Sequence, residues 1–151
     1  MTPAAAFSVA KHFHRAFELC QGDGFRSADG GVNAGIPAVV NLAFAIELGL
    51  KASTLSYGPP PRTHDLQRLY MGLADSDRAK ILSASALNED LVSDQLPQVA
   101  KAFDEWRYIH EEPGTLSISL QFLMMFWLGV SQLAKAKVNE QLAPLRSEHG
   151  E

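Results

Sequence analysis

A recurring three- and four-residue spacing of apolar side chains is the feature of this sequence that most restricts its fold. Between residues 36 and 56 this spacing places Val39, Ala43, Ile46 and Leu50 on one line, as in a helix with a buried face. Strand-like alternation is missing from the chain, and β-branched residues are sparse and scattered. The pattern therefore predicts an all-α protein.

Glycine and proline clusters divide the chain into helices with short connections. The segments GDG (22–24) and YGPPPR (57–62) each stop a helix, because glycine favours turns and proline cannot continue a helix. Thr63 is expected to cap a short middle helix, and Pro97 is expected to kink or break a longer one. The expected helices span residues 3–21, 36–56, 64–74, 75–87, 88–112 and 116–142, the last ending before Pro144.

These elements predict one domain over residues 1–151, with a frayed tail over about 144–151. Four long helices and one short middle helix, joined by short connections, favour an antiparallel up-and-down bundle. The chain's 46% hydrophobic and 20% charged residues fit an ordinary globular protein of this length. The single Cys20 excludes an internal disulfide.

The charge and the apolar runs restrict the cellular setting. A net charge of −4 gives no overall basic field that would attract nucleic acid or anionic membrane. The N-terminus lacks the basic region of a signal peptide. The apolar run from Leu116 to Val130 contains Ser117, Ser119 and Gln121, and it is shorter than the roughly 20 apolar residues of a membrane span. We expect a cytoplasmic protein without membrane contact, in which this run forms a core helix.

The segment FDEWRYIHEE (103–112) carries the densest set of chemically active side chains. Arg107 and His110 are three residues apart, which places them on the same side of a helix. Arginine can stabilise phosphate charge and histidine can transfer a proton near neutral pH, so the pair suits phosphodiester chemistry. The alternative is structural: the histidine suits the end of a helix, and the arginine can pair with Asp104 or Glu111.

Polar side chains in two earlier segments have similar dual interpretations. Glu47 and Lys51 are four residues apart and are most simply a solvated ion pair. Asp65 complements the dipole of the short helix, and His64 could orient a ligand or contact a neighbouring helix. No HExxH or paired CxxC motif is present, so we predict neither a metal site nor a cofactor.

Three segments, taken in order, resemble the HEPN family of prokaryotes and higher eukaryotes. They are PAVVNLAFAIELGLKASTL (37–55), RTHDLQRLYMGL (62–73) and AFDEWRYIHEE (102–112). The resemblance covers most of residues 36–112 and lies in an AxELxLKA helix, an HDLxxLY short helix and an FxxWRYxxE helix. It implies a bundle of four to five helices, usually a homodimer, that binds nucleotide or RNA. Many members are metal-independent ribonucleases of toxin–antitoxin or phage-defence systems. Others are inactive partners of nucleotidyltransferase-like proteins.

The resemblance also assigns roles to particular residues. The family's ribonuclease motif has four to six residues between its arginine and its histidine; Arg107 matches the arginine, but His110 follows after only two. We therefore consider Arg107 and His110 as catalytic residues, with His64 as a substitute for His110. The residues expected to line a ligand-binding cleft are Glu47, Lys51, His64, Asp65, Arg107 and Tyr108. Expected partners are a second copy, RNA or a nucleotide, and a nucleotidyltransferase-like or antitoxin protein. The alternative is a non-catalytic dimeric interaction module with a structural ion-pair network.

Overall fold

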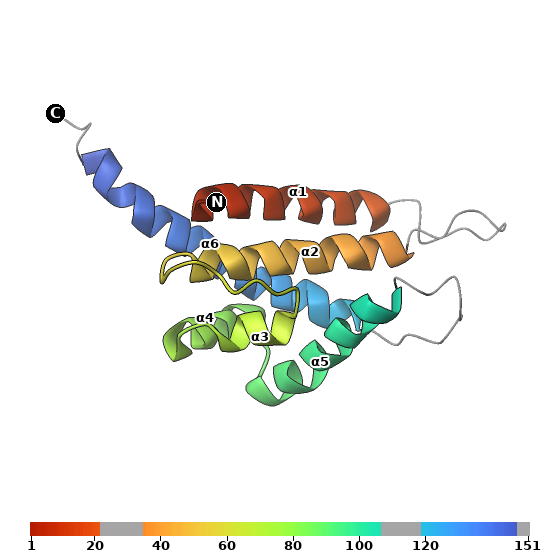
Figure 1. The fold of residues 1–151 in the computed structure, drawn as a ribbon. Coiled ribbons are helices and arrows are strands. Elements are labelled where there is room, and N and C mark those ends of the chain that lie inside the picture. Colours follow the sequence, from red (N-terminus) through yellow and green to blue (C-terminus); the bar gives the residue numbers. More distant parts are fainter. Residues whose placement is uncertain (22–34, 107–118, 148–151) are drawn as a thin grey trace.

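The computed structural model describes residues 1–21, 35–106 and 119–147, and every regular element in these ranges is an α-helix (Figure 1). The all-α prediction is therefore confirmed for the described residues. The elements are α1 (Pro3–Gln21), α2 (Gly35–Thr54), α3 (Leu66–Met71), α4 (Asp75–Ser85), α5 (Glu89–Trp106) and α6 (Leu120–Ser147).

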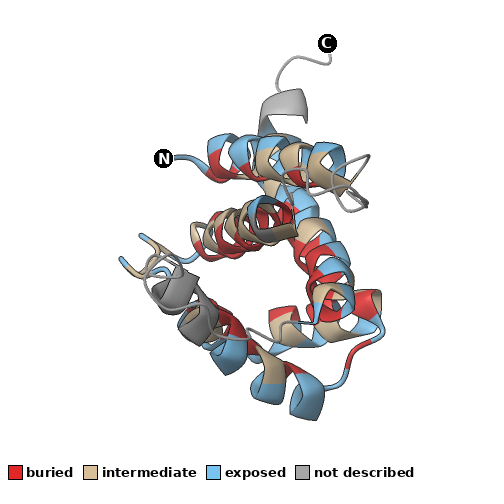
Figure 2. Ribbon diagram, turned by 90° about the vertical axis from the view of Figure 1, so that its right-hand side faces the viewer, coloured by how far each residue is buried: buried red, intermediate tan, exposed pale blue. Residues whose placement is uncertain are grey.

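The helix α2 occupies the centre of the arrangement. It packs against α1, α3 and α6, while α6 also packs against α1 and α4, and α3 packs against α5. Helices α1 and α2 run in opposite directions, and the C-terminal end of α6 extends beyond the other helices (Figure 1). Buried positions lie where helices face one another, and exposed positions lie on the outer sides (Figure 2).

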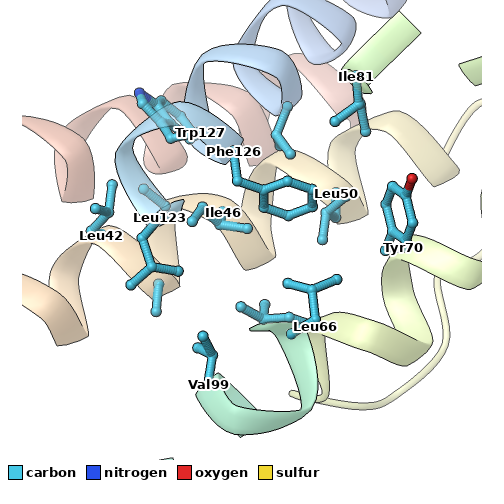
Figure 3. Close-up of a cluster of buried hydrophobic side chains, with 14 of the residues drawn as sticks. Leu42, Ile46, Leu50, Leu66, Tyr70, Ile81, Val99, Leu123, Phe126 and Trp127 are labelled. Carbon is cyan, nitrogen blue, oxygen red and sulfur yellow. The ribbon is translucent and has the colours of Figure 1, made fainter. Parts of the chain in front are cut away.

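The core forms where α2 meets its neighbours. Because α2 is covered by several helices, its buried positions extend well beyond a single line, although Val39 at its beginning is only half-buried. Figure 3 shows side chains of α2, α3, α4, α5 and α6 converging on this region. The labelled core residues are Leu42, Ile46, Leu50, Leu66, Tyr70, Ile81, Val99, Leu123, Phe126 and Trp127.

Two of the expected helix starts are wrong. The N-cap of α3 is Asp65, whose carboxylate accepts hydrogen bonds from the backbone N–H groups of Gln67 and Arg68. Thr63, expected to be the cap, instead accepts a hydrogen bond from the Asp65 N–H through its hydroxyl. At the last helix, α6 begins at Leu120, because Ser119 accepts the N–H of Phe122 and so satisfies one unpaired donor of the first turn.

Neither proline interrupts its helix, so the expected break at Pro97 and the expected end before Pro144 are wrong. The expected kink at Pro97 stays a prediction. Pro97 lies inside α5 without ending it, and Pro144 lies inside the last turn of α6. Proline removes one helical hydrogen bond, but Pro144 is exposed, so water can hydrate the carbonyl that loses its donor. The described residues contain six helices, as many as the expected ranges, although the expected bundle of four long helices and one short helix counted only five. The end of the fifth expected helix, residues 107–112, lies outside the described residues.

A close approach between α4 and α6 depends on Gly129. A Cβ atom at this position would overlap the backbone carbonyl oxygen of Ile81 and lie 2.9 Å from its Cγ2 atom. A glycine in a helix interior costs about 1 kcal/mol relative to alanine, so its presence here is explained by the contact.

We predict that Gly129→Ala lowers the free energy of unfolding by about 1–2 kcal/mol, because overpacking costs about 1–3 kcal/mol and the gain in helix propensity offsets part of it. Urea denaturation measures the change. Gly72→Ala is the matched control, because its Cβ would lie at an ordinary 3.4 Å from the carbonyl oxygens of Arg68 and Leu69. Equal effects of the two substitutions would contradict a close α4–α6 contact.

Candidate functional site

Three of the predicted site residues form one cluster where α2 faces the start of α3. Lys51 Nζ donates to Glu47 Oε1 over 2.6 Å. His64 Nδ1 lies 3.0 Å from Glu47 Oε1 and 3.2 Å from Oε2. We call Glu47, Lys51 and His64 the Glu47 cluster. The four-residue spacing brings the first two together on α2, and the connection between α2 and α3 brings His64 to them.

Glu47 and Lys51 are more buried than the solvated ion pair that their spacing suggested. The side chain of Glu47 is only 8% exposed and that of Lys51 17%, whereas that of His64 is 78% exposed. A carboxylate taken out of water needs charged or hydrogen-bonding partners, and Glu47 has two. The expectation of a solvated pair is therefore wrong, because the packing of neighbouring helices covers this part of α2.

The local sequence fixes the position of His64. Pro59, Pro60 and Pro61 restrict the backbone of the connection. Gly58 before them has a φ of 144°, a conformation that side-chain-bearing residues rarely adopt. Directly after His64, the Asp65 carboxylate caps α3, with Oδ1 2.9 Å from Gln67 N and 3.1 Å from Arg68 N.

This arrangement leaves the His64 ring available for chemistry. Its Nδ1 atom faces the Glu47 carboxylate, while most of the side chain is exposed, so Nε2 can contact a ligand. A carboxylate that orients an imidazole is a common way to position a general acid or base. Glu47, Lys51, His64 and Asp65 are placed by the structure, whereas Arg107, Tyr108 and His110 lie outside the described residues.

A second charged cluster was not anticipated from the sequence. Asp77, in the first turn of α4, is 1% exposed. Its Oδ2 lies 2.8 Å from Lys137 Nζ of α6, and its Oδ1 lies 3.2 Å from Lys80 Nζ. The Lys137 ammonium also lies 5.0 Å from the centroid of the Tyr57 ring, within the range of a cation–π contact. This cluster joins α4, α6 and the start of the connection between α2 and α3.

One signal in the sequence could have revealed Lys137. It follows Val130, Leu133 and Ala134 at helical spacing, so it continues the buried stripe of α6. A lysine on an apolar stripe requires a counter-charge. The partner could not be identified from spacing, because Asp77 lies on a different helix.

We predict that Asp77→Asn lowers the free energy of unfolding by about 3–5 kcal/mol, because it leaves the Lys137 ammonium buried without its counter-charge. Asp75→Asn is the matched control. Asp75 also lies in the first turn of α4 and pairs with Arg78 over 2.6 Å, but its side chain is 96% exposed. Its loss should cost less than about 1 kcal/mol.

Chemical denaturation of both variants, at the same pH and ionic strength, measures the difference. Combining Asp77→Asn with Lys137→Met should recover part of the loss, since the double variant contains no unpaired buried charge. Similar losses for Asp75→Asn and Asp77→Asn would contradict a buried pair.

Within residues 1–21, 35–106 and 119–147, no group of three or more His, Cys, Asp or Glu side chains could hold a metal ion. None of the helices in these ranges has the length and apolar character needed to cross a membrane. Comparison of the chain with protein-family models, curated proteins and solved structures gives no match.

Proposed function

We propose that this chain is a HEPN-like helical bundle that binds nucleotide or RNA, with the Glu47 cluster forming part of the binding site. The observation that carries the proposal is the contact between His64 and Glu47. It joins the polar residues of the first two segments that resemble the family, AxELxLKA on α2 and HDLxxLY at α3.

The charge around His64 supports an anionic ligand. Arg62 and Arg68 are both exposed and lie two residues before and four residues after His64 in the sequence. Lys51 retains partial exposure beside the imidazole. Phosphate groups bind such cationic side chains, and this attraction supplies much of the affinity for nucleic acids. Because the net charge of the chain is −4, an anionic ligand would be attracted by a local cationic patch and not by the whole surface.

Within this proposal, RNA cleavage would be a metal-independent transesterification. Arg107 would stabilise the charge on the phosphorane, and His64 or His110 would transfer the proton. His64 is favoured by its carboxylate partner and exposed ring. The family resemblance further suggests a homodimer in a toxin–antitoxin or phage-defence setting, with a nucleotidyltransferase-like or antitoxin protein as partner.

The second candidate is a non-catalytic interaction module in which the same side chains form a structural ion-pair network. The observation that favours it is the satisfaction of Glu47, which is buried and already contacts both Lys51 and His64. In this case the cluster would hold α2 and α3 together and would have no ligand.

Binding of a fluorescein-labelled single-stranded RNA of mixed sequence, measured by anisotropy, separates the two candidates. We predict that His64→Ala weakens binding by about tenfold through loss of a charge-assisted hydrogen bond. Since His64 is mostly exposed, the melting temperature of the His64→Ala protein should differ little from that of wild type. His12→Ala is the matched control, because His12 is an exposed histidine of α1.

Thermal unfolding with and without RNA or ATP provides the second measurement. A ligand that binds only the folded state raises its stability, so an increase in wild type that His64→Ala reduces would support binding. If no RNA or ATP shifts the melting temperature while Glu47→Gln lowers it substantially, the structural network is the better description. Cleavage assays in EDTA with wild type, His64→Ala, Arg107→Ala and His110→Ala then test catalysis. Equal background cleavage by all four would exclude the enzymatic extension.

A further inference from the structure

An apolar groove of about 480 Å³ lies between α1 and α6. Its volume falls within the range of about 300–1,000 Å³ typical of small-molecule sites. From α1 it is lined by His14 and Phe17, and from α6 by residues between Leu120 and Leu128. No member of the Glu47 cluster lines it, so the groove is independent of the nucleotide-binding proposal.

One wall of the groove is a pair of stacked rings. The His14 and Trp127 rings have centroids 5.0 Å apart and planes 22° apart. Phe17 lies next to His14, with centroids 5.8 Å apart. The two rings cover each other's inner faces, and Trp127 is only 5% exposed. The His14 side chain is 27% exposed, so it offers the larger aromatic contact to a ligand ring, which gains contact area and favourable quadrupole interactions.

The remaining wall is apolar and partly open to water. Met124 is 40% exposed and Leu128 54% exposed, and a ligand that covers them gains the free energy of removing apolar surface from water. Met124 and Met125 have flexible, polarisable side chains that can adapt to the outline of a ligand. The Met124 sulfur already accepts a weak contact from the Gln21 amide nitrogen at 3.8 Å.

The polar groups of the groove indicate a neutral ligand. Among the described residues that line it, none is Asp, Glu, Lys or Arg. Burial lowers the pKa of the His14 imidazole below its ordinary value, while Glu18 acts weakly in the opposite direction. The ring is therefore mostly neutral at pH 7 and can exchange a hydrogen bond with an uncharged group. The Gln121 amide is the other polar group of the lining.

We propose that this groove binds a neutral aromatic molecule of about two fused rings, packed against the His14 ring and Met124, with a hydroxyl or amine near the His14 imidazole. A charged ligand would lose its hydration without gaining a counter-charge among these side chains. A nucleobase fits less well, because the groove has too few polar groups for its several donors and acceptors.

Titration with 1-naphthol, followed by Trp127 fluorescence and by calorimetry, tests the proposal. The chain has two tryptophans, so the Trp106→Phe variant makes Trp127 the only fluorescent indole. We expect saturable one-to-one binding with a Kd on the order of 100 µM, as small fragments reach. The anionic 1-naphthoate, of nearly the same shape, should bind at least tenfold more weakly because its charge is not neutralised.

Two exposed methionines provide a matched pair of variants. Met124→Glu places a carboxylate at the edge of the groove and should weaken 1-naphthol binding at least tenfold. Met71→Glu makes the same change on α3, where Met71 is 54% exposed and outside the groove, and should leave binding unchanged. His14→Phe keeps an aromatic ring but removes the hydrogen bond, so it should weaken binding about fivefold.

Three results would overturn the proposal: no saturable binding, equal affinity for 1-naphthol and 1-naphthoate, or equal effects of Met124→Glu and Met71→Glu. Sedimentation velocity tests whether a second copy occupies the groove instead. Wild-type dimers that dissociate in Met124→Glu, together with no binding of 1-naphthol, would assign the groove to a protein interface and exclude the ligand site.

Discussion

The burial of α2 is the constraint on which the rest of the structure depends. Because α1, α3 and α6 all pack against this helix, most of its side chains must be apolar or have a partner. Its second half nevertheless carries three buried polar residues, Glu47, Ser53 and Thr54. The two hydroxyls are satisfied within the helix, Ser53 by the carbonyl of Gly49 and Thr54 by the carbonyl of Lys51. Glu47 cannot be satisfied in this way, since a carboxylate has no hydrogen to donate to a carbonyl.

The Glu47 cluster follows from this requirement. A buried carboxylate without cationic or N–H partners would be strongly destabilising. Lys51 supplies a charge from the next turn of α2, and His64 supplies a second polar contact from outside the helix. The same contacts that satisfy Glu47 also restrict the His64 ring, so stability and a chemically useful orientation have a common cause here. This is also why a binding role and a structural role for these residues can be separated only by measuring both properties.

The sequence predicted contacts between residues close together on one helix, but not contacts between residues on different helices. Spacing along one helix correctly predicted α1 over Pro3–Gln21 and the proximity of Glu47 to Lys51. It could not give the burial of that pair, because burial depends on which helices cover α2. The Asp77–Lys137 contact was missed for the same reason. The N-cap of α3 is Asp65 and not the expected Thr63, because the Asp65 carboxylate lies one position before the helix. Pro144 was expected to end α6, but a lost hydrogen bond is tolerated in an exposed last turn.

The connection between α2 and α3 relates the two charged clusters to each other. Near its start, the Tyr57 ring contacts Lys137, the partner of Asp77. At its end, His64 contacts Glu47, and Asp65 caps α3. Between these anchors lie three consecutive prolines, whose fixed φ angles limit how far the backbone can adjust. The position of His64 therefore depends on more than its own ion pair. The Tyr57 contact near the start of the connection and the Asp65 cap at its end restrict it as well.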